Sequence, residues 1–103
     1  MGHGVRRQDP PGSVQVSGEV DVASVEEVRI ELEVVLRETG QLAIDTSGVT
    51  FMDSQGLRML ILLGEEAVKA GTTIQVINCS PQVQRLFEIA VPQGIPGVQI
   101  IKQ

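Results

Sequence analysis

Apolar and polar residues alternate in some stretches of this chain and recur every three or four residues in others. Alternation is typical of strands, and a spacing of three and four is typical of helices with one apolar face. The alternating stretches lie at residues 13–20, 41–46, 72–77 and 98–101, and the helical ones at 25–39, 57–70 and 81–90. Strands that alternate with helices indicate βαβ units. We therefore expect one α/β domain with a mixed, mostly parallel sheet of four to five strands, flanked by about three helices.

Cap residues mark the ends of the predicted helices. Ser24 followed by Glu27 is a capping-box pattern, in which each side chain bonds the other's free backbone N–H. Gly40 is expected to end the first helix, and Ser80 before Pro81 is expected to start the third. The second helix is expected to end at Gly71. Its inner face is expected to consist of Leu57, Leu60, Ile61, Gly64 and Val68. Three further apolar residues widen that face, namely Met59, Leu62 and Leu63.

Residues 1–12 precede the first alternating stretch and contain the turn signal Asp9-Pro10-Pro11-Gly12. They are expected to form a flexible lead-in, with His3 in a frayed tail. The alternative is a short edge strand at residues 5–8 that pairs back across the turn. The domain proper is then expected over residues 13–103.

Composition and charge exclude several classes of function. Aromatic residues make up 2% of the sequence, so the core is expected to be aliphatic. A formal net charge of −5 argues against nucleic-acid binding, which needs clustered Lys and Arg, and suits a partner with a basic patch. The longest apolar run, Met59 to Leu63, is far shorter than the roughly 20 residues that span a bilayer. We expect a cytoplasmic protein with no direct nucleic-acid binding and no membrane insertion.

The sequence has little equipment for catalysis. The one histidine, His3, is expected in the frayed tail, so no Ser-His-Asp triad is expected, and a single cysteine excludes an internal disulfide and a multi-cysteine metal site. The phosphate-binding glycine motif of nucleotide hydrolases is also missing. We expect no catalytic residues, no metal and no cofactor, and interpret the protein as a non-enzyme. Cys79 directly follows an apolar strand pattern and is expected to be a small buried hydrophobe.

The segment from Gln41 to Gly71 carries the candidate site. It delivers Asp53-Ser54-Gln55-Gly56 to the start of the longest apolar helix. A plain N-cap by Asp53 or Ser54, worth about 1 kcal/mol, would explain those two residues without any further function. It would not explain Gly56, because glycine costs about 1 kcal/mol against alanine inside a helix. We interpret Gly56 as baring the backbone for another surface and leaving room around the Ser54 hydroxyl.

A serine at that position is suited to modification by another enzyme. Phosphorylation adds a charge of roughly −1.5 to −2 and three acceptor oxygens. The free N–H groups and the positive dipole end at a helix N-terminus tolerate such a charge, so the fold should survive. The contact surface around the serine would nevertheless become charged and strongly hydrated. This would switch the binding of a partner without refolding the carrier.

Three blocks of the sequence, taken together with their order and spacing, resemble those of a known family. They are Gly18-Glu19-Val20-Asp21, Phe51-Met52-Asp53-Ser54-Gln55-Gly56-Leu57 and Ser80-Pro81-x-Val83-x-Arg85-Leu86-Phe87. Together they resemble the STAS domain of bacterial anti-sigma factor antagonists. The resemblance covers nearly the whole chain from residue 13 and implies a STAS-like fold.

The resemblance also implies a regulatory cycle. Ser54 matches the serine that is phosphorylated by an anti-sigma factor, which is itself a serine kinase using ATP. The unphosphorylated antagonist binds that kinase and frees sigma factor, and a metal-dependent Ser/Thr phosphatase resets it. The expected partner-binding residues are Asp21, Asp53, Gln55, Gly56 and Arg58. Two of these keep a structural alternative, since Asp21 could only help to start the first helix and Arg58 could simply be solvated.

Two other functions remain open on the same fold. STAS domains also serve as accessory subunits that brace the ATPase of lipid-transport ABC complexes, in which case Ser54 would only be a cap and the second helix would be the interface. A scaffold subunit of a stress-sensing assembly is the other alternative. Two departures from the family pattern are Gln55, where a smaller residue is common, and the end of the chain at Gln103, where many members carry one more helix. Without that helix, apolar surface is expected to be bare or to pack against another protein.

Overall fold

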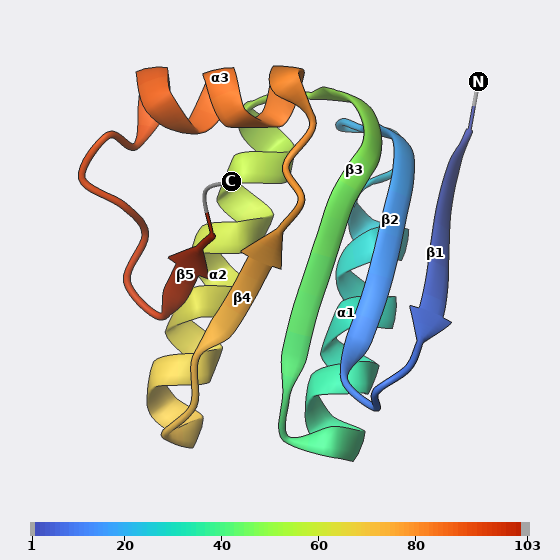
Figure 1. Cartoon of the computed structure of the whole chain (residues 1–103), viewed down its shortest axis with the longest axis vertical. Coiled ribbons are helices and arrows are strands. Elements are labelled where there is room, and N and C mark those ends of the chain that lie inside the picture. Colours follow the sequence, from blue (N-terminus) through green and yellow to red (C-terminus); the bar gives the residue numbers. More distant parts are fainter. Residues whose placement is uncertain (1, 102–103) are drawn as a thin grey trace.

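The structure, a computed structural model, describes residues 2–101 and contains five strands and three helices (Figure 1). Met1 of the predicted lead-in, and Lys102 and Gln103 of the predicted domain, lie outside the described residues. In chain order the elements are β1 (His3–Gln8), β2 (Ser13–Val20), α1 (Val25–Thr39), β3 (Leu42–Met52), α2 (Ser54–Ala70), β4 (Ile74–Ile77), α3 (Pro81–Ala90) and β5 (Val98–Ile100).

The five strands form one mixed sheet whose spatial order equals the chain order, β1-β2-β3-β4-β5. The β1–β2 pair is antiparallel, and the other three pairs are parallel. Helices α1 and α2 lie side by side against one face, and α3 lies across the end of the sheet where β3 and β4 finish (Figure 1). The expected fold class is confirmed, and apart from Phe87 the buried core side chains are aliphatic or methionine.

The N-terminal segment forms an edge strand and not a flexible lead-in, and this strand is longer than the predicted residues 5–8. Strand β1 begins at His3, which pairs with Gly18, and ends at Gln8, which pairs with Ser13. His3 therefore lies in a strand rather than in a frayed tail. The alternating pattern missed His3 and Gly4 because an edge strand of this kind has no fully buried residue.

Helix α1 buries the predicted stripe, but the way it starts differs from the expectation. Val28, Leu32 and Val35 are buried. The Ser24 side chain makes no capping bond to the helix, so the predicted capping box with Glu27 is wrong. The Ser24 hydroxyl instead donates to the Glu19 carbonyl oxygen at 2.7 Å and accepts from the Asp21 N–H at 3.1 Å. It holds the end of β2 in place of capping α1.

Strand β3 continues to Met52, whereas the sequence predicted a strand over 41–46 followed by a loop. Its pairing with β2 has two irregularities, because Gln15 and Ser17 pair with Asp45 and Gly48, and Gly18 and Glu19 pair with Val49 and Phe51. Each irregularity places an extra residue on β3, as a β-bulge does. The buried positions therefore stop alternating after Thr46, which hid the second half of the strand.

Helix α2 is turned slightly from the predicted orientation. Its buried residues are Gly56, Met59, Leu60, Leu63, Gly64 and Ala67. Leu57 and Ile61 are half-buried. Val68 and Leu62 were both expected on the inner face, yet their side chains are 59% and 41% exposed. The inner stripe thus runs through Met59, Leu63 and Ala67.

A close crossing of two glycines fixes the C-terminal strand onto α2. Gly64 and Gly97 approach so closely that a Cβ on Gly64 would lie 2.3 Å from the Pro96 carbonyl oxygen. A Cβ on Gly97 would meet the Gly64 carbonyl oxygen in the same way, and Gly97 has a φ of +80°. No side chain fits at either position, so the crossing depends on both residues being glycine.

We predict that Gly64→Ala destabilises the fold by about 1–3 kcal/mol in denaturant unfolding, although alanine is the better helix former. The backbone oxygen that meets the new methyl group cannot rotate away, unlike the end of a flexible side chain. The control Glu65→Ala, at an exposed neighbouring position of the same helix, should change the free energy of unfolding by less than about 0.5 kcal/mol. A Gly64→Ala protein as stable as wild type would contradict this packing.

Candidate functional site at the carboxyl ends of β2 and β3

The ends of two parallel strands place the candidate site. Val20, the last residue of β2, pairs with Met52, the last residue of β3. The Asp53 N–H continues the ladder by donating to the Val20 carbonyl oxygen at 3.4 Å. The segments that follow the two strands, beginning at Asp21 and Asp53, therefore start side by side at the same edge of the sheet. Asp21, one of the expected partner-binding residues, thus lies beside the segment that carries Ser54.

Asp53 is the N-cap of α2, and Ser54 is not. The Asp53 carboxylate accepts the N–H of Gln55 at 2.9 Å and that of Gly56 at 3.4 Å, while its carbonyl oxygen accepts the N–H of Leu57 at 3.1 Å. Ser54 is the first residue of the helix, its side chain is exposed, and it makes no side-chain hydrogen bond to any described residue. The hydroxyl of Ser54 therefore contributes nothing visible to the start of the helix.

Gly56 is buried, which corrects the interpretation that it bares the backbone for another molecule. A Cβ at this position would lie 2.6 Å from Met52 Cγ and 3.1 Å from Val20 Cγ1. The surface that comes close is the chain's own, formed by the last residues of β2 and β3. The missing side chain lets the first turn of α2 pack onto the strand ends and directs Ser54, two residues earlier, toward solvent.

Asp21 is used to build the turn before α1. Its Oδ1 accepts the N–H of Ala23 at 3.0 Å and that of Ser24 at 3.2 Å. Asp residues favour such positions because the side chain can bond the backbone two residues on. The structural alternative for Asp21 is therefore observed, and its half-buried carboxylate also lies at the edge of the sheet that carries Ser54.

Gln55 and Arg58 are exposed on the first turns of α2. Arg58 follows Ser54 by four residues, so the two side chains share one face of the helix. Arg58 forms no ion pair with any residue in 2–101. The structure thus brings Asp53, Gln55 and Arg58 together around Ser54, adds Asp21 from the turn after β2, and places Gly56 beneath them.

Two exposed apolar side chains at this edge were missed by the sequence analysis. Val22, in the turn after β2, is 76% exposed, and Phe51, one residue before the end of β3, is 44% exposed. The signal for Phe51 was hidden because the second irregularity of β3 puts both Thr50 and Phe51 on the exposed side. Val22 carries no periodic signal, since it lies in a turn.

The Gln82 side chain joins α3 to the end of β3. Its amide oxygen accepts the Met52 N–H at 3.0 Å, and its amide nitrogen donates to the Met52 carbonyl oxygen at 3.4 Å. Both backbone groups of the residue before the cap are therefore held by one side chain of α3. This contact places the N-terminal part of α3 beside the segment that carries Ser54.

The site offers an accessible hydroxyl and charged neighbours but no grouping for metal or nucleophile activation. Across residues 2–101, no set of three His, Cys, Asp or Glu residues is arranged to hold a metal ion. His3 lies in β1, which β2 separates from β3. Within the same described part of the chain, no helix combines the length and apolar character needed to cross a membrane.

Comparison with known proteins identifies the family. A family model described as "Mlab, STAS domain" matches residues 3–93. The chain belongs to the STAS domain family. It is 30% identical over 78 residues to a STAS-domain containing protein of Pseudomonas aeruginosa (strain UCBPP-PA14). The aligned residues make up 76% of this chain and 77% of that protein. It is 29% identical over 85 residues to the anti-sigma-B factor antagonist of Bacillus subtilis (strain 168), covering 82% and 78% of the two chains.

Solved structures of anti-sigma factor antagonists share this STAS fold. One from Mycobacterium paratuberculosis superimposes with a TM-score of 0.70 at 23% identity, covering 94% of this chain and 83% of the other. The antagonist SpoIIAA in its unphosphorylated form superimposes with a TM-score of 0.67 at 17% identity, covering 98% and 88% of the two chains. At these identities the likeness establishes the fold, and the expected STAS-like architecture is confirmed.

We predict that Asp53→Ala lowers the free energy of unfolding by about 1 kcal/mol, because α2 loses the acceptor for two first-turn N–H groups. Ser54→Ala should change the same free energy by less than about 0.5 kcal/mol, because its hydroxyl bonds no described residue. Urea unfolding followed by circular dichroism compares the two variants. A larger loss for Ser54→Ala than for Asp53→Ala would show that Ser54 is the structural cap.

Proposed function

We propose that this STAS domain is an anti-sigma factor antagonist that is switched by phosphorylation of Ser54. In its unphosphorylated form it binds an anti-sigma factor that is a serine kinase, and sigma factor is released. Phospho-Ser54 prevents that binding, and a metal-dependent Ser/Thr phosphatase restores it. The protein itself is a binding partner and not an enzyme. The observation that carries the proposal is the exposed Ser54 hydroxyl, which has no structural duty because Asp53 caps the helix.

The geometry supports transfer of a phosphoryl group to Ser54 by another enzyme. The side chain lies at the first position of a helix, where it is exposed at the edge of the sheet. A foreign active site can approach it without displacing a core residue, since the buried Gly56 and Met52 lie behind it. The relative from Bacillus subtilis, an anti-sigma-B factor antagonist, supports the class of partner.

Asp53 makes the electrostatic effect of phosphorylation strong. The helix N-terminus is already occupied, because the Asp53 carboxylate takes the N–H groups of Gln55 and Gly56. A phosphate on Ser54 would share the helix dipole with this carboxylate and would add its charge of roughly −1.5 to −2 beside it. The surface would change from one exposed hydroxyl to a cluster of negative groups, which a partner that fits the neutral form would have to desolvate.

The exposed apolar side chains extend the proposed contact surface. Val22 and Phe51 lie at the edge of the sheet that carries Ser54, and exposed apolar side chains beside polar groups are typical of protein contact sites. We infer that Asp21, Asp53, Gln55 and Arg58 give the polar part of this surface. Gly56 acts from beneath, by keeping the first turn of α2 against Val20 and Met52.

We predict that incubation with ATP, Mg²⁺ and an anti-sigma kinase encoded beside this protein adds the mass of one phosphate, mapped to Ser54. The control Ser54→Ala should remain unmodified, whereas Ser47→Ala, which removes another exposed serine, should be modified as wild type. Intact-mass spectrometry with site mapping gives the result. Modification at Ser47 or at any residue other than Ser54 would refute the assignment.

We predict that Ser54→Asp weakens binding to the same kinase by at least about tenfold, equivalent to about 1.4 kcal/mol, because a charge enters the contact surface. Ser54→Ala should bind like wild type and stay bound in the presence of ATP. Calorimetry with the purified kinase measures both affinities. Equal affinities of Ser54→Asp and wild type would mean that Ser54 does not face the partner.

A second function is supported by the face of α2 and by the family model, whose description names Mlab rather than an antagonist. Leu62 and Val68 are exposed on α2, the helix expected to form the interface of a STAS subunit that braces the ATPase of a lipid-transport ABC complex. In that case an ATPase subunit would co-purify with the chain. Its binding would be unaffected by Ser54→Asp and lost on Leu62→Asp, which separates the two functions.

A further inference from the structure

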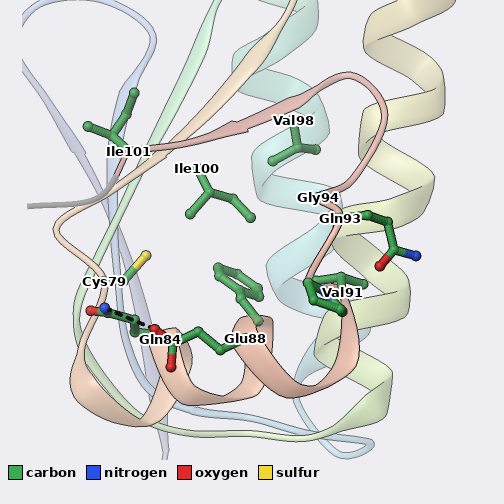
Figure 2. A pocket seen from close by; sticks show the side chains of 11 residues that line it. Cys79, Gln84, Glu88, Val91, Gln93, Gly94, Val98, Ile100 and Ile101 are labelled. Atoms are coloured by element: carbon green, nitrogen blue, oxygen red, sulfur yellow. Dashed lines mark hydrogen bonds between the residues drawn. The ribbon is translucent and has the colours of Figure 1, made fainter.

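A cavity of about 460 Å³ lies away from the Ser54 surface, between α3, β5 and the segment that joins them (Figure 2). Figure 2 shows Val98 and Ile100 on one side of this space and α3 on the other, with Cys79 and Val91 toward its two ends. The volume falls in the range of roughly 300–1,000 Å³ that is usual for small-molecule sites. The eleven lining residues belong to four consecutive pieces of the chain: Cys79, α3, the segment 91–94 and residues 98–101.

The lining of the cavity is mixed, and six of its eleven residues are apolar. The apolar part comes from Phe87, Val91, Pro92, Val98, Ile100 and Ile101. Cys79 adds a half-buried thiol, and burial raises the pKa of that thiol, so it presents its neutral form to the cavity. A buried Phe87 and a buried Val98 form the inner end, whereas Ile100 and Val91 are half-buried.

One carboxylate is available at the rim. Glu88 is exposed on α3, and its carboxylate accepts a long hydrogen bond of 3.4 Å from the Gln84 amide nitrogen. Glu88 forms no ion pair with any residue between 2 and 101. Gln84 and Gln93 are the other polar side chains of the lining. A cationic group placed at this rim would meet a carboxylate that pairs with no cation among residues 2–101, on a protein whose formal net charge is −5.

We propose that this cavity binds a small amphiphilic molecule whose apolar chain or ring contacts Val98, Ile100 and Phe87 and whose cationic amine head lies beside Glu88. The apolar walls match the body of such a molecule, and the carboxylate at the rim selects its head.

The shape of the cavity favours a small molecule over a segment of another protein. The segment after α3 runs past the cavity before it enters β5 (Figure 2), and residues on both sides of that segment line the cavity. The neighbouring antiparallel bridge between Ile95 and Val98 holds this segment against the start of β5. A strand or helix of a partner would have to displace this segment, whereas an alkyl chain can enter from the open side.

This site is independent of the proposed switch. None of the residues around Ser54 lines the cavity, and α3 stands between the two, with Gln82 facing Met52 and Phe87 facing the cavity. Ser54→Ala should therefore bind the amphiphile with the same affinity as wild type. Loss of the phosphorylation switch would leave the cavity proposal intact, and the reverse also holds.

The test uses n-octylamine, protonated at pH 7, and octanoate as a probe of equal length and opposite charge. Each is titrated, below the concentration at which it forms micelles, into the full chain labelled for NMR on backbone amides and on Val and Ile methyl groups. We expect saturable shifts from octylamine at Val98, Ile100 and the amides of 87–94. Octanoate should bind about tenfold more weakly, because attraction to Glu88 becomes repulsion.

Glu88→Gln should remove most of this preference, and the matched control Glu65→Gln, an exposed carboxylate on α2, should keep it. Ile100→Phe, which narrows the cavity, should weaken both probes, and its own spectrum reports whether it is folded. Three results would overturn the proposal. They are no saturable shift at the cavity, shifts centred on Val22 and Phe51 instead, or an unchanged preference for octylamine in Glu88→Gln.

Discussion

The close contact of Gly56 with Val20 and Met52 is the constraint on which the site depends. A Cβ on Gly56 would lie 2.6 Å from Met52 Cγ and 3.1 Å from Val20 Cγ1, so any side chain there would force Met52 to shift. The first turn of α2 therefore packs directly on the ends of two parallel strands, and the chain passes from a buried Met52 to an exposed Ser54 within two residues. A serine that follows such a turn can be exposed while its backbone is rigidly placed.

Two adjacent residues have different roles here, since Asp53 caps α2 and Ser54 presents an exposed hydroxyl. Asp53 satisfies the helix N-terminus, so the Ser54 side chain makes no hydrogen bond that a change at this residue would remove from the described part of the chain. The separation carries a cost, because the capping carboxylate already uses the N–H groups that would otherwise receive a phosphate. The helix end therefore does less to neutralise a phosphate than an uncapped one would, and more of the added charge is presented to a partner. In a regulatory protein this strengthens the effect of modification on binding.

The α3 helix lies between the surface around Ser54 and the cavity beside β5. On one side Gln82 holds both backbone groups of Met52, and on the other Phe87 and Glu88 line the cavity beside β5. The crossing of Gly64 and Gly97 in turn fixes the start of β5 on α2. In the second half of the chain, α3 is thus attached to β3, and β5 is attached to α2.

Local patterns in the sequence carried the fold and the position of Ser54, because helix spacing, glycine ends and the Asp-Ser junction are properties of neighbouring residues. They failed where the cause is a contact between distant residues. The second half of β3 was missed because its register with β2 slips twice, and Gly56 was misread because its partner Val20 lies 36 positions earlier in the numbering. Ser24 was misread for another reason, because its hydroxyl bonds the carbonyl of Glu19, five residues earlier in β2, and makes no bond to its own helix. The exposure of Val68 follows from how α2 turns on the sheet, which no helical pattern specifies.

The central claim is that a charge on Ser54 alters the surface and not the fold. The most direct measurement is an amide NMR spectrum of the protein phosphorylated stoichiometrically at Ser54, compared with that of the unmodified protein. The account predicts shifts confined to residues 20–24 and 51–58, with the amides of Ile44, Val76 and the other core strand positions unchanged. Shifts or line broadening spread through those core strands would contradict it, because the modification would then act by loosening the domain.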